Sequence, residues 1–327
     1  MKKMSRIFIG VCLLGVFAFT TSCKKNEEKT SFQVTMPQIT EEMDGRMYIE
    51  FPSKISKWEL GDQIMVYNLN PETPAQSKAV TFTAIALTAN GGETARFEED
   101  EEIGEVMGDY YRFFYPASAA SGVLEDNKEE FVIAPTQNYR QVDMLQDDGT
   151  YQPVATVDLD AVKMACSKPV TDHFAFEPIT GVLRLRVTNS NKAVSSIVVT
   201  DNTFNLSGNV SMNLFEIKEE TKNQLNAILD SYKAGGDWEA AAAAMRANLG
   251  YSSWNTGKTM TLNCAEPVQL TTSGETWFYI ALRPQALGNG YTVRFNFSDG
   301  TYQDVVMPAN PEKCIKPSVI KNATITL

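Results

Sequence analysis

Few residues of this 327-residue chain have the types and spacing that catalysis requires. His173 is the only histidine, so a nucleophile–base–acid triad would have to be built around this one imidazole. The acidic run 98–102, EEDEE, is typical of a solvated loop rather than of a pair of acid–base carboxylates. Gly-x-Ser-x-Gly elbows, phosphate-binding glycine loops and His-Glu-x-x-His helices do not occur in the sequence. We therefore expect neither an enzyme nor a cofactor.

Cys23 has chemistry of another kind, because it follows an N-terminal targeting pattern. Three positive charges precede the apolar run 7–19, and small residues separate that run from the cysteine. The run is shorter than the roughly 20 apolar residues that span a membrane, so 1–22 is predicted to be a signal peptide. It is similar to a bacterial lipoprotein signal, in which the cysteine is acylated and becomes the first mature residue, although Thr20 stands where leucine is usual. An ordinary cleaved signal with an incidental cysteine is the alternative.

Acylation of Cys23 would anchor the protein without spanning the membrane. Each buried methylene contributes about 0.8 kcal/mol to membrane binding. Two or three acyl chains therefore anchor a protein stably, whereas a single chain gives only marginal binding. Residues 23–31 would then form a solvated tether. The KKNEE run at 24–28 resembles the lysine-plus-acidic tether that places some lipoproteins of Gram-negative anaerobes on the outer face of the outer membrane. We expect a lipid-anchored outer-membrane protein exposed on the cell surface.

Charge argues against nucleic acid as a partner. Removal of residues 1–22 leaves 26 Lys and Arg against 40 Asp and Glu, a charge of −14 over 305 residues. Such an acidic surface repels phosphate, and no basic stripe offsets it.

The cysteines of the mature chain give no metal site. Besides Cys23 they are Cys166, Cys264 and Cys314, none of them in a Cys-x-x-Cys pattern. Cys264 and Cys314 could pair, since both lie in the C-terminal half, or all three could be free and buried.

Most of the chain alternates apolar and polar residues with period two, which predicts short antiparallel strands. The all-β pattern is less regular between 120 and 170. We therefore predict an N-terminal β-sandwich domain at 32–170 and a C-terminal one at 171–327. Ser298-Asp299-Gly300 is predicted to turn a hairpin in the second.

One segment, 217–249, changes to a helical period of 3.6. Gly235-Gly236 ends the first predicted helix and Asp237 can cap a second, which gives an αα-hairpin insert in the C-terminal domain. It either closes one end of the sandwich or binds a partner.

Several stretches resemble the fimbrillin-like surface lipoproteins of Gram-negative anaerobes. The resemblance rests on KWELGDQIMVYN (57–68), YRFFYPAS (111–118), FAFEPITGVLRLRVTN (174–189), IVVTDNTFNLSG (197–208) and TWFYIALRP (276–284), in an order that covers most of the mature chain. It implies two transthyretin-like β-sandwiches in tandem and a role as fimbrial subunit, anchor or tip that supports adhesion. The helical insert departs from that pattern.

The resemblance also implies assembly by strand exchange with other fimbrial subunits or with copies of the same chain. In such proteins an arginine-specific protease removes an N-terminal strand, and a neighbour's strand fills the groove by β-augmentation. The candidate displaced strand carries Phe32, Val34 and Met36, and Arg46 is the candidate cleavage site. The candidate donor strand, at the C-terminus, carries Val319, Ala323, Ile325 and Leu327 on one face. Alternatively Arg46 is only a turn or strand residue, the last strand completes its own sheet, and the protein is an uncleaved anchor or accessory subunit.

A second function remains open, that of a surface lipoprotein that binds a glycan or host ligand without polymerising. Trp238, Tyr251 and Trp254 lie in or beside the insert and could stack on sugar faces, or could seal the insert onto the sandwich.

The lipid anchor can be tested on the mature N-terminus. We expect mass spectrometry of the protein from membranes to find Cys23 as the first residue, carrying fatty acid, because the thiol stands where acylation requires it. Recovery of the mature chain without fatty acid from the soluble periplasm would contradict the anchor.

Overall fold

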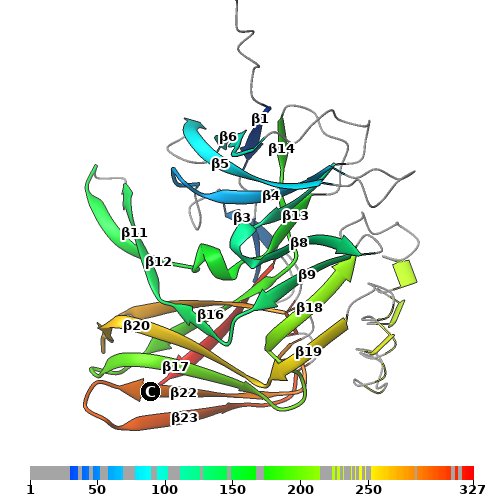
Figure 1. The fold of residues 1–327 in the computed structure, drawn as a ribbon. Helices are drawn as coiled ribbons and strands as arrows, with labels where there is room; N and C mark the ends of the chain where they lie inside the picture. Colours follow the sequence, from blue (N-terminus) through cyan, green and yellow to red (C-terminus); the bar gives the residue numbers. More distant parts are fainter. Residues whose placement is uncertain are drawn as a thin grey trace, which may run out of the picture.

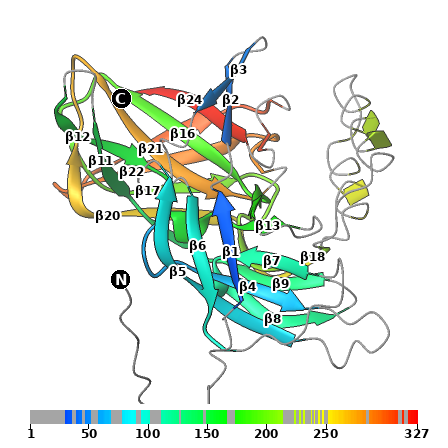
Figure 2. The same cartoon turned by 90° about the horizontal axis from the view of Figure 1, so that it is seen from above.

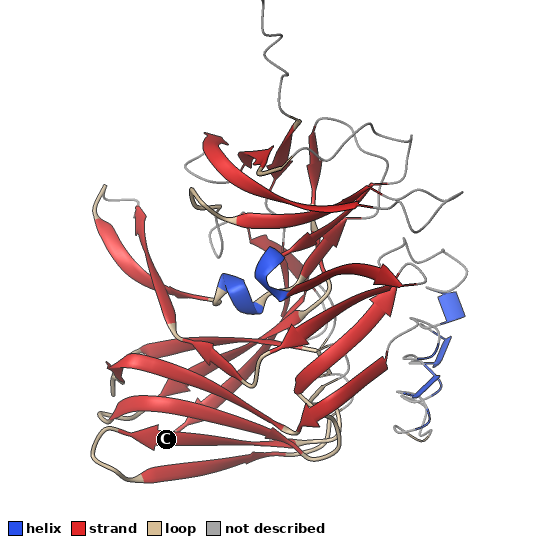
Figure 3. Ribbon diagram, viewed as in Figure 1, coloured by secondary structure: helices blue, strands red, loops and turns tan. Residues whose placement is uncertain are grey.

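The computed structural model is all-β, as the sequence predicts (Figures 1 and 3). It describes residues 30–35, 39–43, 47–51, 58–68, 78–89, 94–101, 111–125, 128–145, 149–166, 173–213, 252–283, 286–310, 314–315 and 319–327, and isolated positions between 223 and 247. Two short 3-10 turns, η2 (Ala117–Ala119) and η3 (Leu159–Ala161), interrupt the strands. No helix among these residues has the length and hydropathy needed to cross a membrane.

The largest unit is sheet A, in the upper part of Figure 1, with the order β14-β1-β6-β5-β4-β7-β13-β15. Its strands are β1 (Ser31–Thr35), β4 (Gln63–Asn68), β5 (Lys78–Ala89), β6 (Thr94–Glu99), β7 (Tyr111–Tyr115), β13 (Met164–Cys166), β14 (His173–Ala175) and β15 (Glu177–Pro178). Neighbouring strands are antiparallel except β1 and β14, which are parallel.

Two five-stranded sheets form a sandwich. Sheet B has the order β21-β16-β24-β2-β3, and sheet D has the order β10-β20-β17-β22-β23. The strands of sheet B are β2 (Ile39–Met43), β3 (Met47–Phe51), β16 (Gly181–Thr188), β21 (Glu275–Leu282) and β24 (Val319–Thr326); those of sheet D are β10 (Thr136–Asn138), β17 (Ala193–Asp201), β20 (Thr259–Gln269), β22 (Tyr291–Phe297) and β23 (Tyr302–Met307).

Two smaller sheets complete the fold. Sheet C has the order β19-β18-β9-β8, and the β11–β12 ribbon is a separate antiparallel pair at the left of Figure 1. Their strands are β8 (Ala120–Glu125), β9 (Lys128–Ile133), β11 (Arg140–Leu145), β12 (Tyr151–Thr156), β18 (Ser207–Asn213) and β19 (Ser252–Gly257).

The apolar side chains form two buried clusters. The larger lies between sheets B and D, where Leu183, Leu185 and Val187 of β16 face inward and the alternate arginines lie on the other face, as the sequence predicts. The smaller lies on sheet A, around the fully buried Trp58. Sheet A is buried on both faces, since Phe113 joins the smaller cluster and the adjacent Phe114 joins the larger. This two-sided burial explains why every residue of β7 is apolar or buried.

Strands from both sides of the predicted boundary near residue 170 share sheets. β2 and β3 pair into sheet B, β9 pairs with β18, and β10 pairs with β20, although all four early strands precede the boundary. Strand β14, which follows it, pairs with β1 in sheet A. The early part of the chain is therefore divided between sheet A and the sandwich rather than confined to one sheet system. The division at 170 stays a prediction.

The insert at 217–249 falls mostly outside the described residues. The positions described within it, such as 223–224 and 243–244, have helical backbone except 237. The Asp237 carboxylate accepts a hydrogen bond from the backbone N–H of Ala240 at 3.4 Å, which is the bond of an N-cap. The αα-hairpin as a whole stays a prediction.

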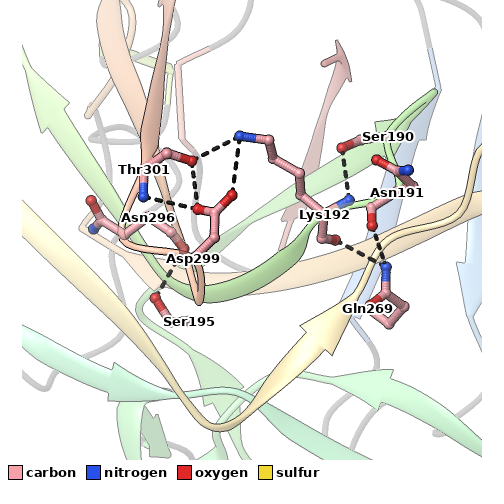
Figure 4. A network of polar contacts seen from close by, with 8 residues as sticks. All are labelled: Ser190, Asn191, Lys192, Ser195, Gln269, Asn296, Asp299 and Thr301. Atoms are coloured by element: carbon pink, nitrogen blue, oxygen red, sulfur yellow. Dashed lines mark hydrogen bonds and ion pairs between the residues drawn. The ribbon is translucent and has the colours of Figure 1, made fainter.

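The predicted hairpin at Ser298-Asp299-Gly300 is confirmed, because it joins the antiparallel strands β22 and β23 (Figure 4). Gly300 has a φ of +81°, a conformation that glycine adopts without strain. Asp299 accepts hydrogen bonds from the backbone N–H of Thr301 at 2.9 Å and from its hydroxyl at 2.6 Å. Lys192 of the neighbouring loop donates to the Thr301 hydroxyl at 2.7 Å and lies 3.6 Å from Asp299. The turn is thus tied to the loop before β17.

A second tight turn, at Gly61-Asp62, leads into β4. Gly61 has a φ of +92°, and the Asp62 carboxylate accepts the backbone N–H of Glu59 at 2.8 Å. The carbonyl of Asp62 also accepts the N–H of Ala84 at 2.8 Å, so the turn is bonded to β5. Burial raises the pKa of Asp62 to about 6, because removal from water disfavours the charged carboxylate.

This pKa predicts how stability depends on pH. The folded state holds the Asp62 proton more tightly than the unfolded chain, so stability falls as pH rises from about 4 to about 6. Asp62→Asn removes this ionisation, and its free energy of unfolding should therefore improve relative to wild type between pH 4 and pH 7 in urea titrations. Asp304→Asn is the matched control of opposite sign, because the hydrogen bond from Arg294 lowers the pKa of Asp304. Parallel pH profiles for wild type and Asp62→Asn would contradict the prediction.

Candidate functional site

The candidate displaced strand, β1, lies inside sheet A rather than at its edge. It pairs antiparallel with β6 over all five residues and parallel with β14 over three. In Figure 2, β1 and β2 follow one another from sheet A towards sheet B. Removal of β1 would therefore leave two facing strands with unpaired peptide groups.

Phe32 fills an aromatic pocket beneath β1. Its ring centroid lies 5.3 Å from that of Phe82, 5.7 Å from Tyr111 and 5.4 Å from Phe113. The last two contacts are edge-on, the geometry that aromatic pairs favour. Phe32 is 6% exposed and Val34 is fully buried, as expected for residues that fill pockets. Met36, the third residue predicted for this face, lies outside the described residues.

Polar contacts fix both ends of β1. At its start, the backbone N–H of Thr30 donates to the Glu99 carboxylate at 2.7 Å, and the carbonyl of Thr30 accepts the N–H of Glu99 at 3.2 Å. At its end, the hydroxyls of Thr35 and Thr94 lie 3.1 Å apart. These bonds set the register of β1 on β6.

The candidate donor strand, β24, is also an interior strand. It pairs parallel with β16 over seven residues and parallel with β2 over three. Ala323 and Ile325 are buried in the larger cluster, and Leu327 is half-buried against it, so the predicted apolar face is correct. Val319 at the start of the strand is half-buried. In this structure β24 completes its own sheet.

Strand β2 is the element that sequence reasoning missed. It pairs with the first residues of β24 and, through Met43 opposite Met47, with β3. Beyond Lys321, β24 has no strand beside it on this side among the described residues. The apolar residues of β2 lie only at its two ends, a pattern that gives no period-two signal. Its position after Pro37 and before Asp44-Gly45 is the only cue.

Arg46 lies outside the described residues, in the three-residue connection between β2 and β3. A chain break at this connection would separate β1 and β2 together from the remainder, because both precede it. Cys23 and the aromatic side chains of Trp238, Tyr251 and Trp254 also lie outside the described residues.

Other chemistry-bearing residues do not gather into a site. Cys264 and Cys314 do not form a disulfide with one another, and burial raises the pKa of Cys264 to about 11, which disfavours the reactive thiolate. His173 is the first residue of β14, and only the backbone of His173 is described. Within the described ranges, no three His, Cys, Asp or Glu residues are arranged to hold a metal ion.

No family model and no curated protein matches the chain. Among solved structures it is similar to a cell adhesion protein from Bacteroides uniformis, with 16% identity, a TM-score of 0.44, and coverage of 92% of this chain and 93% of that one. A cell adhesion protein from Bacteroides ovatus gives 12% identity, a TM-score of 0.40, and coverage of 90% and 92%. The tip fimbrial protein Mfa3 from Porphyromonas gingivalis gives 9% identity, a TM-score of 0.27, and coverage of 85% and 81%.

Identities of 9% to 16% and TM-scores of 0.27 to 0.44 are too low to carry function to this chain.

The aromatic pocket predicts a large effect of truncation at Phe32. Phe32→Ala should lower the free energy of unfolding by about 3 to 5 kcal/mol, because it empties a pocket lined by three rings. Gln33→Ala, at the exposed neighbouring position, should change it by less than about 0.5 kcal/mol. Urea unfolding of both variants measures the difference. A loss below about 1 kcal/mol for Phe32→Ala would mean that β1 is not anchored by this ring.

Proposed function

We propose that this chain is a non-enzymatic, lipid-anchored protein of the cell surface that serves as a subunit, anchor or tip of fimbriae. It is held to the outer membrane by lipid on Cys23 and joins other fimbrial subunits, or copies of itself, by strand complementation. Its two halves correspond to tandem transthyretin-like sandwiches, with the αα-hairpin at 217–249 inserted in the second. It supports adhesion through a host or glycan ligand.

The observation that carries this proposal is the position of β1. A strand bonded on both sides, with Phe32 in an aromatic pocket, makes a groove that is costly to leave empty. Burial of a phenylalanine contributes about 1.5 to 3 kcal/mol, and an incoming strand with an apolar residue at the same place would restore both that burial and the ladder.

Cleavage at Arg46 would act on two sheets at once. Loss of residues 23–46 takes β1 from sheet A and β2 from sheet B. The first loss opens the acceptor groove between β14 and β6. The second leaves β24 paired only with β16, so one whole edge of the candidate donor strand is released.

A second candidate, an uncleaved anchor or accessory subunit, is favoured by the packing of β24. Donation would require this strand to leave its ladder with β16 and to withdraw Ala323 and Ile325 from the larger cluster. A subunit that keeps both end strands would cap a filament or fix it to the membrane.

Treatment of the purified mature protein with an arginine-specific protease distinguishes these candidates. Exchange predicts a cut after Arg46, loss of the fragment 23–46, and filaments visible by electron microscopy. Arg46→Ala should remain uncut and monomeric, whereas Arg140→Ala, at an exposed arginine of β11, should behave as wild type. A chain that survives intact, or is cut without assembly, would contradict subunit exchange. Cells that lack the protein yet keep normal filaments would contradict the fimbrial role itself.

A further inference from the structure

A cavity beside β21 has no role in the proposed strand exchange. A cavity of about 390 Å³ lies between β12 of the ribbon and β21, the edge strand of sheet B. Pro153, Val154 and Ala155 of β12 line one wall, and residues of β21 line the other. This volume is within the range of about 300 to 1,000 Å³ that is usual for small-ligand sites.

Trp277 provides a fixed aromatic surface in this cavity. The Arg184 guanidinium lies over the indole at 4.2 Å from the ring centroid, and that of Arg186 lies at 5.4 Å. Arg184 is held by Asn322, whose side-chain oxygen accepts its Nε–H at 2.5 Å, and Arg186 is paired with Glu275. Both guanidiniums come from β16, on the opposite flank of β21 from β12. Trp277 and Arg184 both line the cavity, so the indole is held there by its contact with this guanidinium.

The backbone of β21 adds fixed hydrogen-bonding groups. At Ala281, the N–H donates to the Gln137 side-chain oxygen at 2.9 Å and the carbonyl accepts from the Gln137 amide nitrogen at 2.6 Å. The peptide groups of Ala281 therefore point away from β16. Because the pattern of an antiparallel ladder repeats every two residues, those of Tyr279 and Trp277 point the same way, to the side of β21 that faces away from β16.

Side chains of several chemical types surround these peptide groups. Gln141, which hydrogen-bonds the Tyr139 hydroxyl, offers an amide, and Glu275 offers a carboxylate. Arg184 and the Tyr279 hydroxyl, which hydrogen-bond one another, form the buried floor. An apolar aromatic face beside planar amide, carboxylate and guanidinium groups suits a ligand that has both a C–H face and a rim of hydroxyls.

We propose that this cavity binds one or two sugar units of a glycan. The ring would stack on Trp277, while its hydroxyls bond to the exposed peptide groups of β21 and to Gln141 and Glu275.

A peptide strand added between β12 and β21 is the competing occupant, and the spacing disfavours it. Neighbouring strands lie about 4.8 Å apart, so an inserted strand needs about 9.6 Å between its two neighbours. Cα atoms of β12 and β21 approach within 8 Å. Where the two strands come this close, a further strand does not fit between them.

The test uses the purified mature protein and an array of mono- and oligosaccharides, followed by calorimetric titration of the best-bound glycan. Trp277→Ala should weaken binding by about tenfold or more, the equivalent of one stacked ring. Gln141→Ala should weaken it by about three- to tenfold without disturbing the fold, since Gln141 is exposed. If Trp277→Ala fails to fold in thermal unfolding, Gln141→Ala decides.

Tyr302→Ala is the matched control, because Tyr302 is 62% exposed and stacks with Arg294 at 4.4 Å but does not line the cavity. It should leave binding unchanged. The proposal is overturned if no saccharide binds, if Tyr302→Ala weakens binding as much as Trp277→Ala, or if binding depends on Trp254 and not on Trp277 or Gln141. Wild-type monomer suffices for each measurement, so the result does not depend on strand exchange.

Discussion

Every strand must pair its peptide groups along both edges or expose them to water, and this requirement governs the structure from β1 to β24. At Ala281 the requirement is met by a single side chain, since the Gln137 amide bonds both the N–H and the carbonyl where no strand lies. Gln137 is only 3% exposed and reaches from sheet D to sheet B, so it also closes the sandwich at that edge. The edges that remain open are where another molecule can bind.

The same requirement makes sheet A a rigid frame for the candidate acceptor groove. Its central strands are covered on both faces, and Tyr67 of β4 donates its hydroxyl to the fully buried Glu129 of β9. Glu129 also accepts the backbone N–H of Ser121 at 2.6 Å, so one carboxylate joins sheet A to two strands of sheet C. Burial raises the pKa of Glu129, while these hydrogen bonds act in the opposite direction. Loss of β1 would thus open a groove in a sheet that is held in place by its contacts with sheet C.

Sequence patterns predicted what depends on local alternation and turn chemistry. The inward face of β16 and the hairpin at Asp299-Gly300 follow from period two and from the positive φ that glycine permits. Sequence patterns could not predict which strands share a sheet, because pairing joins segments far apart in the chain. The pairing of β2 with β24 spans almost the whole chain, and no residue of β2 encodes it. The apolar face of β24 was predicted correctly, yet its place between β16 and β2 was not.

The cavity beside Trp277 could not be predicted for a related reason. Sequence reasoning placed the sugar-stacking candidates at Trp238, Tyr251 and Trp254, because these aromatic residues lie in or beside the insert. Trp277 begins the continuous apolar run of β21 and therefore looks like a core residue. The register of β21 on β16 sets Arg186 opposite Trp277, and the β11–β12 ribbon lies beside them. Because of this arrangement, Trp277 is an aromatic surface of the cavity that is held by a guanidinium. Assembly and recognition would then use different edges of one protein, sheet A for a neighbouring strand and β21 for a ligand, so that a filament could form without closing the binding cavity.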